Sequence, residues 1–274
     1  MDGLYSQLSN LIGIPTSYFA SPAFNLSPSP IHINGVREMY GSLFNAMDKM
    51  ETAEDAAHIF MEHMRVAFDL NVSPEEGKKK NYRANYLRLL KGWLFDSNRP
   101  EGAVMKGWAE SRFGLFPLFH QEPITGVNSP AYWAYTMEKM HTRFHNNAIN
   151  SQFDLLYEFC QYYLDRFGPR KRKFTLYRGT NIGDVTHQVL EKREKKEWVV
   201  RNNSLVSYTA DVERADEFGD TVLEVEMPFE KVLCFPQLLP GALPKSEMEY
   251  IVLGGDCLSR VVNVSDTREK KRAR

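Results

Sequence analysis

The sequence has few cysteines, no long apolar run and almost no net charge. Its three cysteines, Cys160, Cys234 and Cys257, show neither zinc-site nor disulfide spacing, and we expect them to stay reduced in a cytoplasm. No stretch approaches the roughly eighteen uninterrupted apolar residues of a membrane span, and we expect no signal peptide. The formal net charge of −1 gives no basic field for nucleic acid. We therefore expect a cytoplasmic protein with no membrane span and no nucleic-acid partner.

The sequence also lacks the common signatures of nucleotide and metal sites. It has no glycine-rich phosphate loop and no Rossmann fingerprint. His141 and His145 stand four residues apart, a spacing that can bind zinc on a helix, but neither an adjacent glutamate nor a third ligand accompanies them. We predict no metal site.

What the chain does contain is enough apolar material for a sizeable core, because 43% of its 274 residues are hydrophobic. Residues 1–37 form an arm in which prolines disfavour regular structure, although its aromatic residues predict packing onto the rest of the chain. Residues 38–168 have helical periodicity, 169–266 contain short strands, and 267–274 are a basic tail. Helices followed by strands predict an α+β fold.

Helix signals subdivide residues 38–168. The predicted N-caps are Thr52, Asn81, Ser129 and Ser151. The core stripe of the helix after Asn81 includes Trp93. The side chains expected to point inward after Ser129 are Trp133, Met137, Met140 and Phe144. This region carries no catalytic motif, so it either shapes recognition of a target or regulator or only completes the core.

Short strands are predicted at 174–178, 205–209, 221–227, 231–235, 249–253 and 259–264. Gly254 and Gly255 are expected to end the strand that begins at Glu249, and residues 185–199 are predicted to be helical. The segment 236–245 is either a loop that faces a protein substrate, with its leucines exposed, or an ordinary surface connection.

Two carboxylates enter the strand that precedes Gly254. Glu247 and Glu249 are two residues apart, so their side chains share one strand face. A buried carboxylate is costly unless it is paired, so the pair is either an exposed strand end or part of a site.

Two upstream stretches favour a site. Arg178 ends a short strand and is followed by Gly179, an arrangement that suits an anionic ligand because a guanidinium binds phosphate oxygens with two prongs. Ser207 and Thr209 share a face of a later strand, with Tyr208 between them either touching a ligand or facing the core. Ser204 is an alternative to Ser207.

In this order, Arg178, the Ser207–Thr209 motif and the Glu247–Glu249 motif resemble the arginine, serine and glutamate signature of ADP-ribosyltransferases. The segments 17–25 and 31–38 resemble the N-terminus of the bacterial dinitrogenase reductase ADP-ribosyltransferases. This resemblance covers nearly the whole chain. It implies a catalytic core of two small, mainly antiparallel sheets after the helical region.

The resemblance also implies a role for each motif residue. Glu249 is the catalytic glutamate, Glu247 receives the acceptor arginine, and Ser207 orients Glu249. Arg178 holds the pyrophosphate of NAD, which is the substrate. The further residues expected to contact NAD are Gly179, Thr180, Ser207 and Thr209.

The function implied is transfer of ADP-ribose from NAD to an arginine of dinitrogenase reductase, which switches off nitrogen fixation. A PII signal protein is the implied regulator. The alternatives are an arginine-specific transferase with another protein target and a non-catalytic module that binds a partner on the same fold.

Overall fold

The computed structural model describes residues 9–263 except 71–83, 142, 147, 182, 185 and 244–248. Helices fill the first part of this range and antiparallel strands the last part, which confirms the predicted α+β class. No helix within the described ranges is long and apolar enough to cross a membrane. The predicted cap Asn81 and the predicted site residue Glu247 lie outside the described residues.

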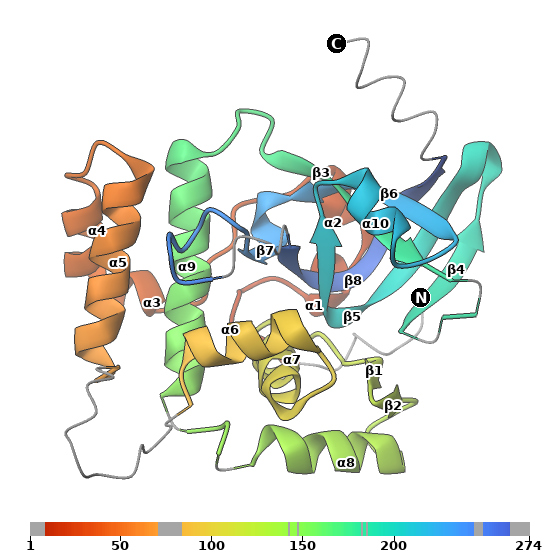
Figure 1. Cartoon of the computed structure of the whole chain (residues 1–274), viewed down its shortest axis with the longest axis horizontal. Helices are drawn as coiled ribbons and strands as arrows, with labels where there is room; N and C mark the ends of the chain where they lie inside the picture. Colours follow the sequence, from red (N-terminus) through yellow and green to blue (C-terminus); the bar gives the residue numbers. More distant parts are fainter. Residues whose placement is uncertain are drawn as a thin grey trace.

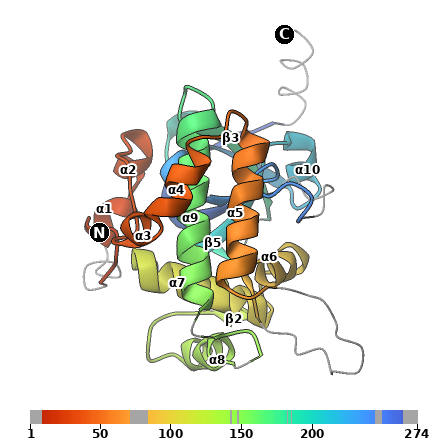
Figure 2. The ribbon, with the colours of Figure 1, turned by 90° about the vertical axis from the view of Figure 1, so that its left-hand side faces the viewer.

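The helices form layers beside the sheet (Figure 1). Their bounds are α1 Thr16–Phe19, α2 Pro22–Leu26, α3 Val36–Met39, α4 Gly41–Met47, α5 Ala53–Ala67, α6 Tyr86–Phe95, α7 Pro100–Phe113, α8 Pro130–Lys139 and α9 Ile149–Phe167. Helix α9 lies between α5 and the sheet, and α7 lies between α8 and the sheet. The second view shows α4 and α5 lying along α9 (Figure 2).

The sheet is antiparallel and its central strands close on themselves. Its strands are β3 Lys173–Thr180, β4 His187–Lys192, β5 Glu197–Thr209, β6 Thr221–Pro228, β7 Val232–Cys234 and β8 Glu249–Val262. Their order is β4-β5-β3-β6-β8-β7, and a further β5–β8 pairing joins β3, β5, β8 and β6 into a ring. Instead of the two separate sheets expected, these strands thus form one barrel-like sheet, because the long strands β5 and β8 each pair with three neighbours. A separate hairpin pairs β1 Phe119–His120 with β2 Glu122–Pro123.

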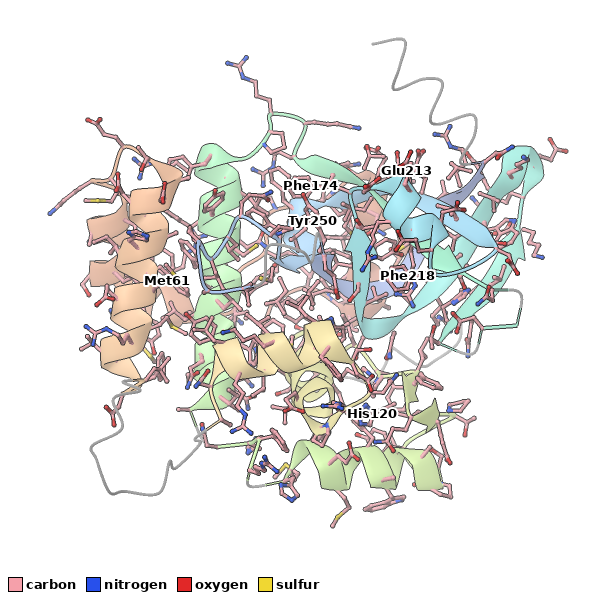
Figure 3. All side chains as sticks on the ribbon, in the orientation of Figure 1. Met61, His120, Phe174, Glu213, Phe218 and Tyr250 are labelled. Carbon is pink, nitrogen blue, oxygen red and sulfur yellow. The ribbon has the colours of Figure 1, made fainter. Side chains whose placement is uncertain are left out.

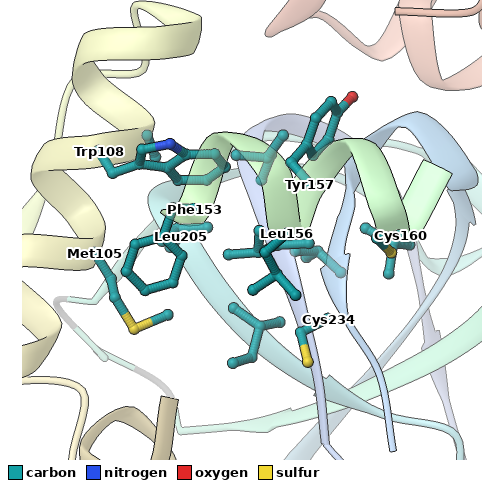
Figure 4. Packing of buried hydrophobic residues seen from close by; sticks show 14 of the residues in the cluster. Met105, Trp108, Phe153, Leu156, Tyr157, Cys160, Leu205 and Cys234 are labelled. Carbon is teal, nitrogen blue, oxygen red and sulfur yellow. The ribbon is translucent and has the colours of Figure 1, made fainter. Parts of the chain in front are cut away.

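Helix α9 joins the helical layers to the sheet. It is buried on most of its circumference, so its apolar residues face both layers. Figure 4 shows Phe153 and Leu156 of α9 packed with Trp108 of α7, Leu205 of β5 and Cys234 of β7. The helical region therefore completes the core of the sheet.

The predicted helix starts are only partly correct. Thr52 and Ser129 cap α5 and α8 by accepting hydrogen bonds from backbone N–H groups, and Pro130 occupies the first turn of α8. Asn85 caps α6. The start predicted at Ser151 is wrong, because α9 begins at Ile149.

The inward stripe predicted for α8 is also wrong for most of its members. Trp133 and Met137 are 61% and 74% exposed, and Met140, beyond the helix end, is 58% exposed. The opposite face, with Tyr135 completely buried, packs on α7, where the Tyr135 hydroxyl donates to Glu110 at 3.0 Å. A polar partner on α7 has thus decided which face turns inward.

Gly254 does not end its strand, because β8 continues to Val262. Between the pairs Asn202–Gly255 and Leu205–Leu253, two residues of β5 oppose the single Gly254, which makes a β-bulge. A Cβ atom at position 254 would lie 1.7 Å from the carbonyl oxygen of Asn203. The glycine therefore allows the two bent strands to approach each other.

The helix predicted over 185–199 is wrong. Residues 187–192 form β4, which pairs with the first half of β5 as a hairpin. The charged side chains from Glu191 onward fit an edge strand as well as a solvated helix, because both place them in water.

The N-terminal arm packs against the bulged part of β8. Phe19 and Phe24 are completely buried, which confirms the packing predicted for the arm. The backbone N–H of Asp256 donates to the carbonyl of Ala20 at 2.6 Å. Below them, the buried ammonium of Lys231 lies 4.9 Å from the ring centroid of Phe19 and donates to the carbonyl of Gly254.

Candidate functional site

Strands β5 and β8 bring the serine and the glutamate of the two motifs together. Ser207 pairs with Ile251, and Thr209 pairs with Glu249, so Ser207 and Glu249 are diagonal neighbours on one sheet face. The hydroxyl of Ser207 donates to Oε1 of Glu249. Both residues are half-buried.

Aromatic side chains pack on the opposite face of the sheet from this pair. Tyr250, which follows Glu249, lies with its ring centroid 5.1 Å from that of Phe174 on β3 (Figure 3). Tyr250 is 8% exposed, and its burial raises the pKa of its phenol. The packed rings of Tyr250 and Phe174 thus support the backbone at the start of β8.

A third side chain, from the helical region, contacts this pair. The indole N–H of Trp93, on α6, lies 2.9 Å from Oγ of Ser207 and 3.1 Å from Oε1 of Glu249. The core stripe predicted from the sequence explains the burial of Trp93, which is 3% exposed, but not these hydrogen bonds. The sequence carried no signal for them, because they join residues far apart in the chain.

Arg178 approaches the same group from β3. Its Nη1 donates to the backbone carbonyl of Ser207 at 3.0 Å, and its Nη2 donates to Oγ1 of Thr186 at 3.3 Å. Its Nε is buried and has no hydrogen-bond partner among the described residues. Both acceptors are uncharged, so neither hydrogen bond neutralises the guanidinium.

A carboxylate and an imidazole lie close to Arg178. Burial tends to raise the pKa of Asp184, but hydrogen bonds from the backbone and hydroxyl of Thr186 hold it below its usual value. Burial and the charge of Arg178 lower the pKa of His187. At neutral pH the group therefore contains a cation, a carboxylate and a neutral imidazole.

The other residues predicted to contact NAD are more deeply buried. Thr180 is 2% exposed and its hydroxyl donates to Asp184 at 3.2 Å, while Thr209 is 8% exposed and accepts from the backbone of Asp211 at 3.1 Å. A Cβ atom on Gly179 would lie 1.9 Å from the carbonyl of Ala215 in helix α10, Val212–Asp216. The close approach that Gly179 permits is thus to α10.

The sequence left two alternatives open, one for the serine of the motif and one for the side chain of Tyr208. Ser204 is 1% exposed, and its hydroxyl finds no partner within the described ranges. Tyr208 is 3% exposed, so it faces the core, where its hydroxyl donates to Asn202 at 3.3 Å. The serine that meets Glu249 is Ser207.

The leucines of the loop before Glu249 are not exposed as expected. Leu238 and Leu239 are 0% and 1% exposed, so these leucines belong to the core. A surface hollow beside the ends of β3 and α10 includes Asp216, Glu217 and Asp220. Its carboxylates would repel a pyrophosphate, so it is a poor phosphate site.

Among the described residues, no three histidine, cysteine or acidic side chains are grouped as metal ligands. His141 and His145 follow the end of α8, and a turn joins them in place of the helix that their spacing suggested.

The comparisons with known proteins agree with these motifs. The model of the dinitrogenase reductase ADP-ribosyltransferase (DRAT) family matches residues 9–261. The chain belongs to the DRAT family. It is 48% identical over 258 residues to the NAD(+)–dinitrogen-reductase ADP-D-ribosyltransferase of Rhodospirillum rubrum, and the alignment covers 91% of this chain and 93% of the relative. No solved structure matches the chain significantly.

The match to the DRAT family covers nearly the whole chain, including the helical region. In this DRAT protein, the arginine, serine and second glutamate of the predicted signature meet at one end of the barrel-like sheet. Trp93, from the helical region, adds an aromatic donor to the same group.

Proposed function

We propose that this DRAT protein transfers ADP-ribose from NAD to an arginine of dinitrogenase reductase, and so switches off nitrogen fixation. The observation that carries the proposal is the hydrogen-bonded pair Ser207–Glu249, with Arg178 bonded to the backbone of the same serine. Family membership and the name of the Rhodospirillum rubrum relative support the choice of donor and acceptor protein.

The reaction replaces one bond to C1′ of the ribose by another. The bond to nicotinamide breaks, a bond to a guanidine nitrogen of the acceptor forms, and the acceptor gives up one proton. Positive charge develops on the ribose during this exchange, as in glycoside hydrolysis. A preorganised carboxylate stabilises such charge electrostatically. Glu249 is assigned this role, because it is half-buried and Ser207 donates a hydrogen bond to it.

The other residues bind and orient. Arg178 donates two hydrogen bonds to uncharged oxygens, and its buried Nε has no partner among the described residues, which suits the pyrophosphate of NAD. Ser207 fixes Oε1 of Glu249, and the backbone of Gly179 is assigned to the nicotinamide amide. Glu247, outside the described residues, is assigned to attract the acceptor guanidinium and take its proton.

Regulation and location are proposed on the resemblance of the sequence to the family. A PII signal protein is the proposed regulator, and the cytoplasm is the proposed compartment, where NAD and dinitrogenase reductase would both be available.

Incubation with NAD labelled in its ADP-ribose part tests the proposal. We expect label on dinitrogenase reductase and release of nicotinamide. Label on other proteins alone would indicate an arginine transferase with another target. Binding of dinitrogenase reductase without either product would indicate a non-catalytic module.

A further inference from the structure

Helix α6 brings its only tryptophan to the proposed catalytic pair. Trp93 is 3% exposed, and its N–H reaches both Oγ of Ser207 and Oε1 of Glu249. Trp93 is not part of the signature, yet it connects the helical region to two signature residues.

The chemistry of the indole determines the direction of the hydrogen bonds. An indole N–H donates and has no acceptor lone pair, and it does not titrate at physiological pH. When it donates to Oγ of Ser207, the hydroxyl hydrogen of Ser207 remains to be directed at Oε1 of Glu249, as observed. Trp93 therefore favours the arrangement in which serine donates and glutamate accepts.

Contacts with α9 and α7 support helix α6 and its indole. The backbone N–H of Tyr86 at the start of α6 donates to Oε1 of Gln152 on α9 at 2.9 Å. The buried Nζ of Lys106 on α7 lies 5.9 Å from the Trp93 ring centroid. Lys106 is itself fixed by Oδ1 of Asn98 at 3.2 Å and by the carbonyl of Phe119 at 3.0 Å.

We infer that Trp93 is a positioning residue for ADP-ribosyl transfer: it orients Ser207 and the carboxylate of Glu249 for the ribose. The inference rests on the proposed role of Glu249. It assigns the helical region a part in the chemistry, through one side chain.

Trp93→Phe tests the inference, because it removes the N–H and keeps most of the ring. We expect kcat for transfer to dinitrogenase reductase to fall about tenfold to a hundredfold, the effect of losing a hydrogen bond to a charged group. The KM for NAD should change less than threefold, since the indole is not assigned to ground-state binding. An unchanged kcat would overturn the inference.

Trp108→Phe is the matched control. Trp108 is also buried, and its N–H donates to Oδ1 of Asp154 at 2.7 Å, a carboxylate paired with Arg112 on the same helix as Trp108. This variant loses an equivalent bond elsewhere in the helical region. We expect its kcat to stay within threefold of the parent, and an equal fall in both variants would show a general structural effect instead.

A double-mutant cycle separates this inference from the proposed function. If Trp93 acts through Glu249, Trp93→Phe should cause little further loss in a Glu249→Gln background. Independent, multiplying losses would overturn the positioning role. A Glu249→Gln protein with the parent rate would refute the proposed role of Glu249, whereas a slow Glu249→Gln with a normal Trp93→Phe would refute only the positioning role.

Indole N–H signals in ¹⁵N NMR keep the test valid if Trp93→Phe does not fold. The chain has four tryptophans, so four such signals are expected. Ser207→Ala should shift one buried indole signal and leave that of Trp108, identified with Trp108→Phe, unchanged. If Ser207→Ala shifts none of the four, the hydrogen bond is absent in solution and the inference fails.

Discussion

Ser207 and Glu249 are joined diagonally across β5 and β8, with the serine hydroxyl donating to the glutamate carboxylate. The directly opposite partner of Glu249 is Thr209, whose hydroxyl instead accepts from the backbone before α10. Thr209 therefore stabilises the end of β5, while Ser207 orients the carboxylate.

Replacing the carboxylate tests its electrostatic role. Glu249→Gln keeps the size of the side chain and removes its charge, so we expect transfer to fall about a hundred- to thousandfold with little change in NAD affinity. Nicotinamide release and calorimetric NAD binding measure the two effects. A rate within tenfold of the parent would contradict the role.

Arg178→Lys keeps the charge but loses the planar fork. We expect NAD affinity, measured by calorimetry, to fall at least about tenfold, or about 1.4 kcal/mol. Arg193→Lys is the control, because Arg193 is an exposed arginine paired with Glu191 at 2.8 Å. Equal affinities in the parent and Arg178→Lys would place the phosphates elsewhere.

The role proposed for Glu247 separates two activities. Glu247→Gln removes the charge that would attract and deprotonate a guanidinium, whereas water needs no such help to cleave NAD. Protein labelling should be lost while slow nicotinamide release continues. Loss of both would assign Glu247 to ribose chemistry or structure, and retention of both would make it an exposed strand-end residue.

Two buried lysines predict how stability depends on pH. Burial lowers the pKa of Lys106 to about 7, against the opposing charges of Asp96 and Glu138, and lowers that of Lys231 to about 8. Above these values, and until about pH 10.5, the unfolded chain binds more protons than the folded one, so stability rises with pH.

The two lysines can be separated by substitution. In thermal melts, Lys106→Met should lose the rise that begins near pH 7, while Lys231→Met should lose only the part above about pH 8. A rise from pH 7 to 8 that survives in Lys106→Met would show that Lys106 does not cause it.

The exposed apolar face of α8 predicts unequal effects on stability. Trp133→Ser and Met137→Ser should change the free energy of unfolding by no more than about 0.5 kcal/mol, because both side chains are mainly in water. Tyr135→Phe on the opposite face should cost about 1 kcal/mol, since it removes a buried hydrogen bond to Glu110, although Tyr132 and Lys139 still donate to that carboxylate. Equal losses in all three variants, measured by urea unfolding, would contradict the orientation of α8.

Local chemistry made part of this fold predictable. The caps at Thr52 and Ser129 depend on a few neighbouring residues, so the sequence alone identified them. The strand positions of Arg178 and Ser207 followed from alternation and from the family resemblance.

The errors arose where distant residues decide the structure. The orientation of α8 depends on Glu110 of another helix, and the continuation of β8 depends on the bulge at Asn203. Trp93 fitted a core stripe equally well with or without a hydrogen bond to Glu249. Helical periodicity indicates burial but does not identify the polar partner that a buried group will meet.

The contact between the N-terminal arm and β8 also has a consequence for folding during synthesis. Asn25 of the arm donates to the carbonyl of Asp256, 231 residues later. The arm leaves the ribosome well before the strand that covers it, so the arm cannot make these contacts until β8 has also been made. Because β8 begins at Glu249, the same late strand supplies the proposed catalytic carboxylate. A nascent chain therefore gains its carboxylate and the closing contacts of its arm in one late step.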